Sequence, residues 1–275
     1  MNISGKTNIC VIIGDPVEHS LSPAMHNAAY EALGIDDEFV FVAAHVKVED
    51  VKEVVQAVRV MNIRGLTCTI PHKIEVMKYL DEIDSIAEKI GAVNTVVNEN
   101  GRLKGYNTDW QGTVIPLENV MGSLKGKSVA LIGAGGAARA MAYGVIERGA
   151  KLSIYNRTKE KAETLANQLS TTVTVFGYDD MHREIQKHDI ILNATNLGMG
   201  NLINQTPVPK ECIHKGQVVF DAVYSPRETR LLKESSDQGA ITIQGIEMLL
   251  YQGVSQFELY TRRKAPIEVM RKVLQ

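Results

Sequence analysis

An apolar segment that runs directly into a cluster of glycines constrains the fold of this chain more than any other feature. Residues 129–132 read Val-Ala-Leu-Ile and are followed by Gly133-Ala134-Gly135-Gly136, after which residues 137–147 are rich in alanine. A short apolar run that ends in glycine is typical of a buried strand, and the alanine-rich segment favours a helix. The sequence therefore predicts a strand, a tight turn and a helix in direct succession, as in an α/β protein.

Short apolar runs alternate with segments of helical periodicity on both sides of this turn. Strands are predicted at about residues 9–13, 39–44, 66–70, 93–97, 129–132, 151–155, 190–193 and 218–221, and helices at about 22–33, 51–60, 107–121, 137–147, 159–169, 245–262 and 267–274. This alternation predicts mostly parallel sheets covered by helices. A chain of 275 residues with a polar, linker-like segment at 122–127 is expected to form two domains.

Composition argues against several classes of protein. The net charge is −2 and charges of both signs are interspersed, so no broad basic surface is expected for nucleic acid or a membrane. No segment approaches the roughly 18 apolar residues of a membrane span, and the N-terminus lacks the apolar core of a signal peptide. Cys10, Cys68 and Cys212 are odd in number and widely spaced, and the histidines lack metal-ligand spacing. We expect a cytoplasmic protein with free thiols and no metal site.

The glycine turn has the spacing of a dinucleotide-binding site, Gly133-x-Gly135-x-x-Ala138. Gly133 would allow the tight turn, Gly135 would let the backbone approach a pyrophosphate, and Ala138 is small enough for close packing of helix on strand. The N-terminus of the following helix offers free N–H groups to phosphate. An ordinary glycine turn is the alternative, but the flanking strand and helix, with a second strand downstream, favour a Rossmann cofactor domain.

The end of the next strand indicates which dinucleotide binds. It reads Tyr155-Asn156-Arg157-Thr158-Lys159-Glu160-Lys161, with no acid at Asn156 or Arg157 to bind the ribose hydroxyls of NAD. A guanidinium matches phosphate oxygens in a bidentate fork, so Arg157 favours the 2′-phosphate of NADP(H). The alternative is that Lys159 and Lys161 are solvated residues at the start of a helix.

Three other polar segments lie where strands end or helices begin. Ser20 and Ser22 precede a predicted helix and could both donate to one carboxylate, although Ser22 could equally be an N-cap. Lys73 follows a predicted strand and Pro71, where ligands bind at the carboxyl end of a parallel sheet, although most lysines are simply exposed. Residues 91–95 and 105–109 form the third segment, in which Asp109 could merely favour a helix N-terminus by its charge.

Together these motifs resemble those of the shikimate dehydrogenases, within the shikimate/quinate dehydrogenase family. The motifs are HSLSP at 19–23, TIPHK at 69–73, GAVNT at 91–95, GYNTD at 105–109, GAGGAA at 133–138, NRT at 156–158 and Gly245-x-x-Met248-x-x-x-Gln252. They occur in family order between about residues 9 and 262. The resemblance implies an NADP-dependent enzyme that reversibly reduces 3-dehydroshikimate to shikimate, in the pathway that leads to the aromatic amino acids.

The resemblance also implies roles for the matching residues. Lys73 and Asp109 would be the catalytic pair, with the proton carried by Lys73, Asp109 or both, and His72 is expected to point elsewhere. Besides this pair, the substrate would contact Ser20, Ser22, Thr69, Asn94, Tyr224 and Gln252. The cofactor would contact Gly133, Ala134, Gly135, Gly136, Ala137, Ala138, Asn156, Arg157, Thr158, Lys161, Ala222 and Gly245.

The family architecture implies two α/β domains separated by a cleft. Residues 1–108 with about 241–275 would form the substrate-binding domain, with a mostly parallel sheet, and about 120–240 the Rossmann NADP-binding domain. A quinate or dual quinate/shikimate dehydrogenase remains an alternative, as does an NADPH-binding regulator without activity. Another Rossmann dehydrogenase lacks support in the first hundred residues. The sequence allows a monomer or a homodimer.

Overall fold

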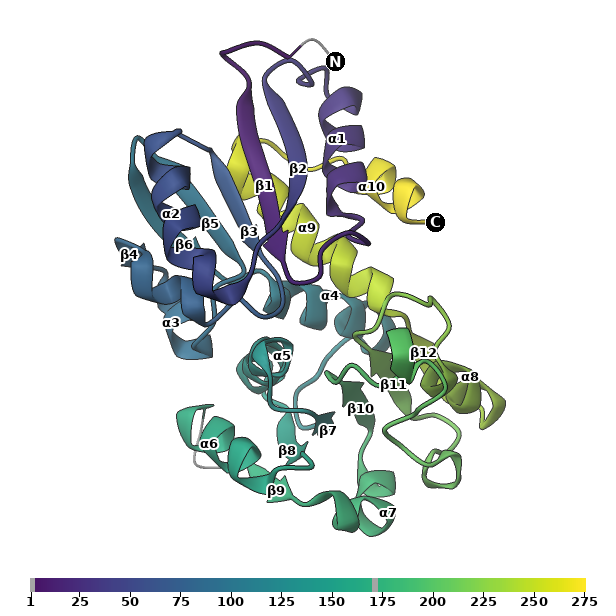
Figure 1. The fold of residues 1–275 in the computed structure, drawn as a ribbon. Helices are drawn as coiled ribbons and strands as arrows, with labels where there is room; N and C mark the ends of the chain where they lie inside the picture. Colours follow the sequence, from purple (N-terminus) through teal and green to yellow (C-terminus); the bar gives the residue numbers. More distant parts are fainter. Residues whose placement is uncertain (1–2, 170–172) are drawn as a thin grey trace. The chain divides into compact units, whose positions relative to one another are not determined.

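The computed structural model describes residues 3–169 and 173–275 and divides into two compact units. The first unit runs to Thr108 and includes Gln252–Gln275, and the second is Asp109–Tyr251. Each unit contains a six-stranded sheet covered by helices (Figure 1). Among the described residues, no helix combines the length and the apolar character needed to span a bilayer.

The sheet of the first unit has the strand order β2-β1-β3-β5-β6-β4. Its strands are β1 (Asn8–Gly14), β2 (Phe39–His45), β3 (Gly65–Cys68), β4 (Glu82–Ile83), β5 (Thr95–Glu99) and β6 (Arg102–Tyr106). β2, β1 and β3 are parallel, whereas β5 is antiparallel to both β3 and β6. The helices are α1 (Ser22–Ala32), α2 (Val51–Val60), α3 (Ser85–Ile90), α10 (Ile267–Leu274) and the last part of α9 (Gly245–Thr261).

The sequence analysis did not predict the β5–β6 hairpin. Its turn contains Asn100 and Gly101 with φ of 55° and 89°, as a tight hairpin turn requires. The Asn100-Gly101 pair is a sequence signal for such a turn. The strand expected at 93–97 begins two residues before β5. β3 also ends earlier than predicted, at Cys68.

Both faces of the first sheet are covered. On one face Val55 and Val58 of α2 pack against Val11, Leu66 and other buried strand residues. On the other face aromatic rings gather, and the ring of His26 in α1 stacks on Phe41 with 4.3 Å between centroids. The last five residues of β1 are all buried, as expected of a central strand covered on both faces, whereas burial alternates along β6.

The sheet of the second unit has the order β12-β11-β10-β7-β8-β9, and all its strands are parallel. The strands are β7 (Ser128–Ile132), β8 (Lys151–Tyr155), β9 (Thr174–Phe176), β10 (Ile190–Asn193), β11 (Val218–Asp221) and β12 (Ile241–Ile243). Its helices are α4 (Asp109–Met121), α5 (Gly136–Glu147), α6 (Lys159–Leu169), α7 (Met181–Glu184), α8 (Arg230–Asp237) and the first part of α9. This strand order is that of the Rossmann fold.

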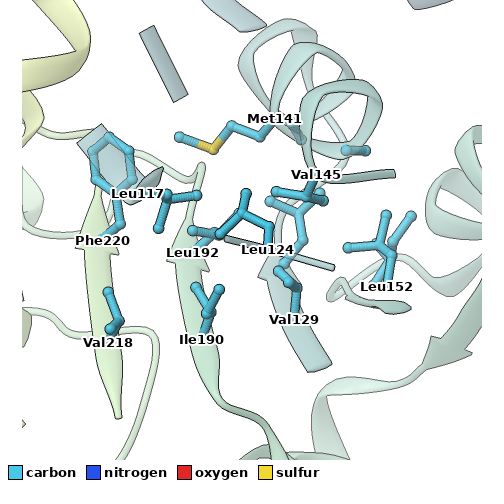
Figure 2. Packing of buried hydrophobic residues seen from close by; sticks show 14 of the residues in the cluster. Leu117, Leu124, Val129, Met141, Val145, Leu152, Ile190, Leu192, Val218 and Phe220 are labelled. Atoms are coloured by element: carbon cyan, nitrogen blue, oxygen red, sulfur yellow. The ribbon is translucent and has the colours of Figure 1, made fainter. Parts of the chain in front are cut away.

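Alternation along β7 explains the two cores of the second unit. Val129 and Leu131 face α4, α5 and α6, while Ala130 and Ile132 face the opposite side, where α8 packs. Figure 2 shows the first of these cores, in which strand side chains such as Val129 and Ile190 lie beneath Met141 and Val145 of α5. The second unit extends to Tyr251, and its sheet includes β12, which pairs with β11.

Candidate active site

Topology gathers the polar segments of the first unit at one edge of its sheet. β1 and β3 are parallel, so both end there, and the antiparallel β5 begins there opposite the end of β6. Thr69 follows β3, Asn94 precedes β5, and residues 107–109 follow β6. The backbone N–H of Cys68 donates to the carbonyl oxygen of Asn94 at 2.8 Å, which joins two of these segments directly.

Asn94 is only 1% exposed, and its amide is held in one orientation. Its Oδ1 accepts from the backbone N–H of Thr108 and from the Thr95 hydroxyl, both at 2.8 Å, and its Nδ2 donates to Thr108 Oγ1 at 2.9 Å. Gln256 Nε2 in turn donates to Thr95 Oγ1 at 3.0 Å. The sequence analysis missed Thr95, Thr108 and Gln256 as supporting residues, because a threonine or glutamine gives no sign of its partner before the chain folds.

Lys73 lies in the loop after β3, where the backbone N–H of Val93 donates to its carbonyl oxygen at 2.8 Å. This bond ties the Lys73 loop to the segment that carries Asn94. The neighbouring His72 is fully buried, and its Nε2 lies 2.8 Å from the carbonyl oxygen of Val46. Burial lowers the pKa of His72 below its usual value, which suits a neutral structural imidazole.

Ser22 is the first residue of α1 and is buried, while Leu21 occupies the N-cap position. The N-cap interpretation of Ser22 is therefore wrong. Ser20 Oγ accepts from the backbone N–H of Ser22 at 3.3 Å, which keeps the two serines close. Thr69 is packed against Gly14, where an added Cβ would lie 2.5 Å from Thr69 Cγ2. In α9, Gln252 is 7% exposed and stands one turn before Gln256.

In the second unit, the glycine turn has the geometry that the motif requires. Gly133 has a φ of +112°, and a Cβ there would lie 3.2 Å from the carbonyl oxygen of Ala194. Gly135 is the N-cap of α5, and a Cβ there would meet nothing within 4 Å. Ala138 is fully buried against the sheet. The first N–H groups of α5 thus border open space, where they can bind a pyrophosphate.

A pocket of about 230 Å³ lies beside this turn and is lined by Ala134, Gly135, Asn156, Arg157, Thr158 and Lys161. Asn156 Nδ2 donates to the carbonyl oxygen of Thr158 at 2.7 Å, which shapes the loop after β8. The lining combines two cations with hydroxyl and amide groups and contains no carboxylate. These residues fit a 2′-phosphate better than the bare ribose hydroxyls of NAD.

Ala222, Tyr224 and Gly245 lie near the ends of β10 and β11, and Asp109 begins α4. The backbone N–H of Ala222 donates to the carbonyl oxygen of Asn193 at 2.9 Å. Gly245 is close to the carbonyl oxygens of Ala222 and Val223, which leave no room for a Cβ. Burial raises the pKa of Tyr224, so its hydroxyl stays protonated. Asp109 is the first residue of α4 and is 4% exposed.

Asp221 is not among the predicted site residues, although an acid at the end of an apolar strand is an unusual signal. Asp221 is the last residue of β11 and is fully buried. Three groups donate to its carboxylate: Asn193 Nδ2, the backbone N–H of Val223 and the hydroxyl of Thr229.

A Rossmann sheet with this glycine turn and phosphate pocket defines a protein that binds a nicotinamide dinucleotide. Three family models match successive parts of the chain: the shikimate dehydrogenase substrate binding domain at 12–96, shikimate / quinate 5-dehydrogenase at 117–247 and the shikimate 5′-dehydrogenase C-terminal domain at 245–275. A shikimate dehydrogenase (NADP(+)) from Dehalococcoides mccartyi is 44% identical, over 95% of this chain and 93% of its own. The chain therefore belongs to the shikimate dehydrogenase family.

Solved structures agree with this membership. A crystal structure of a shikimate dehydrogenase in complex with NADP⁺ has a TM-score of 0.94 and 43% identity, covering 99% of this chain and 96% of its own. A quinate dehydrogenase from Corynebacterium glutamicum in complex with NAD has a TM-score of 0.90 and 30% identity, covering 99% of both chains. The same fold thus carries enzymes for two related substrates and two cofactors.

Proposed function

We propose that this protein is an NADP-dependent shikimate dehydrogenase, which reversibly reduces 3-dehydroshikimate to shikimate in the shikimate pathway. The observation that carries the proposal is the cationic pocket after β8, lined by Arg157 and Lys161, in a chain similar over almost its whole length to NADP⁺-dependent members of the family. We assign NADP(H) binding to the second unit and most of the substrate contacts to the first.

NADP(H) would be held by the first turn of α5, by the pocket residues after β8 and by the backbone at Ala222 and Gly245. When bound, NADPH supplies the hydride that reduces the C3 carbonyl. The Arg157 guanidinium suits the 2′-phosphate, because its planar fork can donate two hydrogen bonds to phosphate oxygens. Gly245 matters through its small size, since any side chain there would strike the backbone that carries Ala222.

Lys73 and Asp109 are the proposed catalytic pair. As the C3 carbonyl is reduced, negative charge develops on its oxygen, and a proton must be supplied to that oxygen. An ammonium group can meet both demands, so Lys73 would stabilise the oxygen and donate the proton. The carboxylate of Asp109 would favour the charged form of the lysine, and in the reverse direction the pair would accept the proton of the C3 hydroxyl.

The other substrate contacts are assigned by the character of each group. Ser20 and Ser22 would donate hydroxyl hydrogen bonds to the substrate carboxylate near the start of α1. Thr69, Asn94 and Gln252 would bind the ring hydroxyls, and the hydrogen bonds of Asn94 to Thr95 and Thr108 hold its amide in a constant orientation. Tyr224 is a further proposed substrate contact.

The test is the absorbance of reduced nicotinamide in four reactions, in which shikimate and quinate are each offered NADP⁺ and NAD⁺. Rapid reduction of NADP⁺ with shikimate alone supports the proposal. Activity mainly with quinate or NAD⁺ would move the protein to the quinate branch, which the resemblance to a quinate dehydrogenase makes worth measuring. No change in absorbance in any of the four reactions, with folded protein that still binds NADPH, would favour a regulator without activity.

We also propose a cytoplasmic enzyme, a monomer or a homodimer. The reaction interconverts two soluble metabolites and uses a pool of NADP(H), both of which belong to central metabolism. All three cysteines are free and buried, as suits a reducing compartment. Separation by size and light scattering would decide between monomer and dimer.

A further inference from the structure

The buried carboxylate of Asp221 makes an unusual set of contacts at the carboxyl edge of the second sheet. Its Oδ1 accepts from Asn193 Nδ2 at 2.9 Å and from the backbone N–H of Val223 at 3.0 Å, and its Oδ2 accepts from Thr229 Oγ1 at 2.6 Å. All three donors are neutral. Burial raises the pKa of Asp221 to about 6, because a charged group is costly at a buried position.

Asn193 extends these contacts to the neighbouring strand. It ends β10 directly opposite Asp221 in the strand register. Its Oδ1 accepts from the backbone N–H of Thr195 at 3.0 Å and from the Thr195 hydroxyl at 2.7 Å. The backbone N–H of Leu197 donates to the same hydroxyl at 3.3 Å. Asp221 and Asn193 therefore fix the first residues of the loops after both β10 and β11.

These two loops border the proposed cofactor site on the side away from the 2′-phosphate pocket. The loop after β10 touches the glycine turn, because a Cβ on Gly133 would lie 3.2 Å from the carbonyl oxygen of Ala194 and 3.3 Å from Thr195 Cγ2. In a Rossmann sheet the dinucleotide crosses the carboxyl edge at the point where the strand order reverses. With the phosphate pocket beside β8, the nicotinamide half must extend from β7 toward β10 and β11.

We infer that Asp221 is a positioning residue, which acts through Asn193, Val223 and Thr229 to hold the two loops that support the nicotinamide half of the cofactor. This inference rests on the proposed function. A carboxylate suits the task because it accepts only, so three donors from three segments must converge on it in one arrangement. An apolar side chain would avoid the free-energy cost of burying a charge. It would, however, leave the three donors without a partner and the loops free to move.

The experiment compares Asp221→Ala and Asp221→Asn with a matched control, Asp189→Asn. Asp189 precedes β10 at the opposite edge of the same sheet and accepts from the backbone N–H and hydroxyl of Ser128 at 2.8 and 2.7 Å. For each full-length variant we would measure kcat and KM with shikimate and NADP⁺, thermal unfolding, and affinity for NADPH. Affinity for adenosine 2′,5′-bisphosphate, which carries the 2′-phosphate end without nicotinamide, completes the set.

We expect Asp221→Ala to lower kcat by about 10²-fold, the scale of a small misplacement of reacting groups. NADPH affinity should fall, while affinity for adenosine 2′,5′-bisphosphate stays within about twofold, since the altered loops do not touch the 2′-phosphate pocket. Asp221→Asn should recover most of the activity, to within about tenfold of the native protein, because an amide can accept at Oδ1 and donate to Thr229. Asp189→Asn should leave kcat unchanged.

Equal losses of affinity for NADPH and adenosine 2′,5′-bisphosphate, or native kcat in folded Asp221→Ala, would overturn the inference. If Asp221→Ala does not fold, Thr229→Val and Thr229→Ser replace it. The serine should restore the kcat that the valine loses, and equal kcat in both would count against the inference. If the native chain does not oxidise shikimate, the proposed function fails, and the two affinities still decide whether Asp221 serves the nicotinamide half.

Discussion

At the scale of single residues, the chemistry of this protein depends on side chains whose partners come from distant parts of the chain. Asn94 is held by Thr108, and the Thr95 hydroxyl that supports it is held in turn by Gln256 of α9. Such a network removes the freedom of the amide to flip, so that the proposed substrate contact at Asn94 is fixed before a substrate binds.

Replacing Lys73 with alanine should lower kcat for shikimate oxidation by roughly 10²- to 10⁴-fold, the usual range for loss of a general acid–base group. Binding of NADP⁺ and shikimate should change much less. The control is Lys78→Ala in the same segment, whose ammonium is exposed and pairs with Glu75 at 2.7 Å, and which should retain native turnover. Full activity in Lys73→Ala would remove Lys73 from the catalytic pair.

Replacing Arg157 with alanine should weaken NADPH binding by about 1.5–3 kcal/mol, the range for one lost hydrogen bond to a charged group. The weak use of NADH should change little, because NADH has no 2′-phosphate. Arg183→Ala is the control, since Arg183 is exposed and pairs with Asp180 on the same unit. Titrating each variant with both cofactors gives the comparison, and equal losses with NADPH and NADH would contradict the assignment of Arg157.

At the scale of elements, the sheet edge of the first unit is built by close approach of loops. Thr69 leaves β3 and lies against Gly14, the last residue of β1, and its backbone N–H donates to the carbonyl oxygen of Ile13. Glycine at the end of β1 is therefore a spatial requirement, because its φ is ordinary and only the missing Cβ leaves room for Thr69.

Replacing Gly14 with alanine should displace Thr69 and raise KM for shikimate more than KM for NADP⁺. The new Cβ would lie 2.5 Å from Thr69 Cγ2 and 3.2 Å from the carbonyl oxygen of Pro16, so a loop must shift. Gly5→Ala is the matched control, since a Cβ there meets nothing within 4 Å. Steady-state kinetics with each substrate varied in turn would show the effect, and an unchanged KM for shikimate would argue against a role for Thr69.

At the scale of the whole molecule, each unit has its own sheet and its own buried cores, and the stability of each can be probed by a residue of that unit alone. In the first unit His26 is fully buried, its ring 4.3 Å from that of Phe41 and 6.2 Å from that of Phe257 between centroids. Burial lowers the pKa of His26 to about 3. The unfolded chain, with a histidine pKa near 6.5, therefore binds a proton on His26 that the folded unit excludes.

The free energy of unfolding should therefore contain the full contribution of neutral His26 above about pH 6.5. Below that pH this contribution should fall by about 1.4 kcal/mol per pH unit, until the pH reaches about 3. His26→Phe keeps a ring in the stack and removes the titration. Its free energy of unfolding relative to the native protein should rise by about 2 kcal/mol between pH 8 and pH 5. Denaturant unfolding at both pH values measures this, and a constant difference would show that the pKa of His26 is the same in the folded and the unfolded chain.

The sequence by itself determined the local structure and the family of this protein. The Rossmann unit was predicted by the glycine turn and by the apolar runs at 129–132, 190–193 and 218–221. Its preference for NADP(H) was predicted by Arg157 and by the absence of an acid at 156 and 157. Both predictions succeed because strand burial and phosphate binding depend on residues that are neighbours in the sequence. The sequence did not predict the short strands β4, β9 and β12 or the β5–β6 hairpin, because short or half-exposed strands have weak periodicity.

Only the tertiary structure decided which residues support the site. Asp221, Asn193 and Thr229 meet because β10 and β11 pair in register, and Gln256 reaches Thr95 because α9 packs on a sheet formed more than a hundred residues earlier. A hydrogen bond between distant residues leaves no pattern in a single sequence, because any polar side chain could make it. The fold decides which two groups meet, and it buries both where water cannot take the place of either partner.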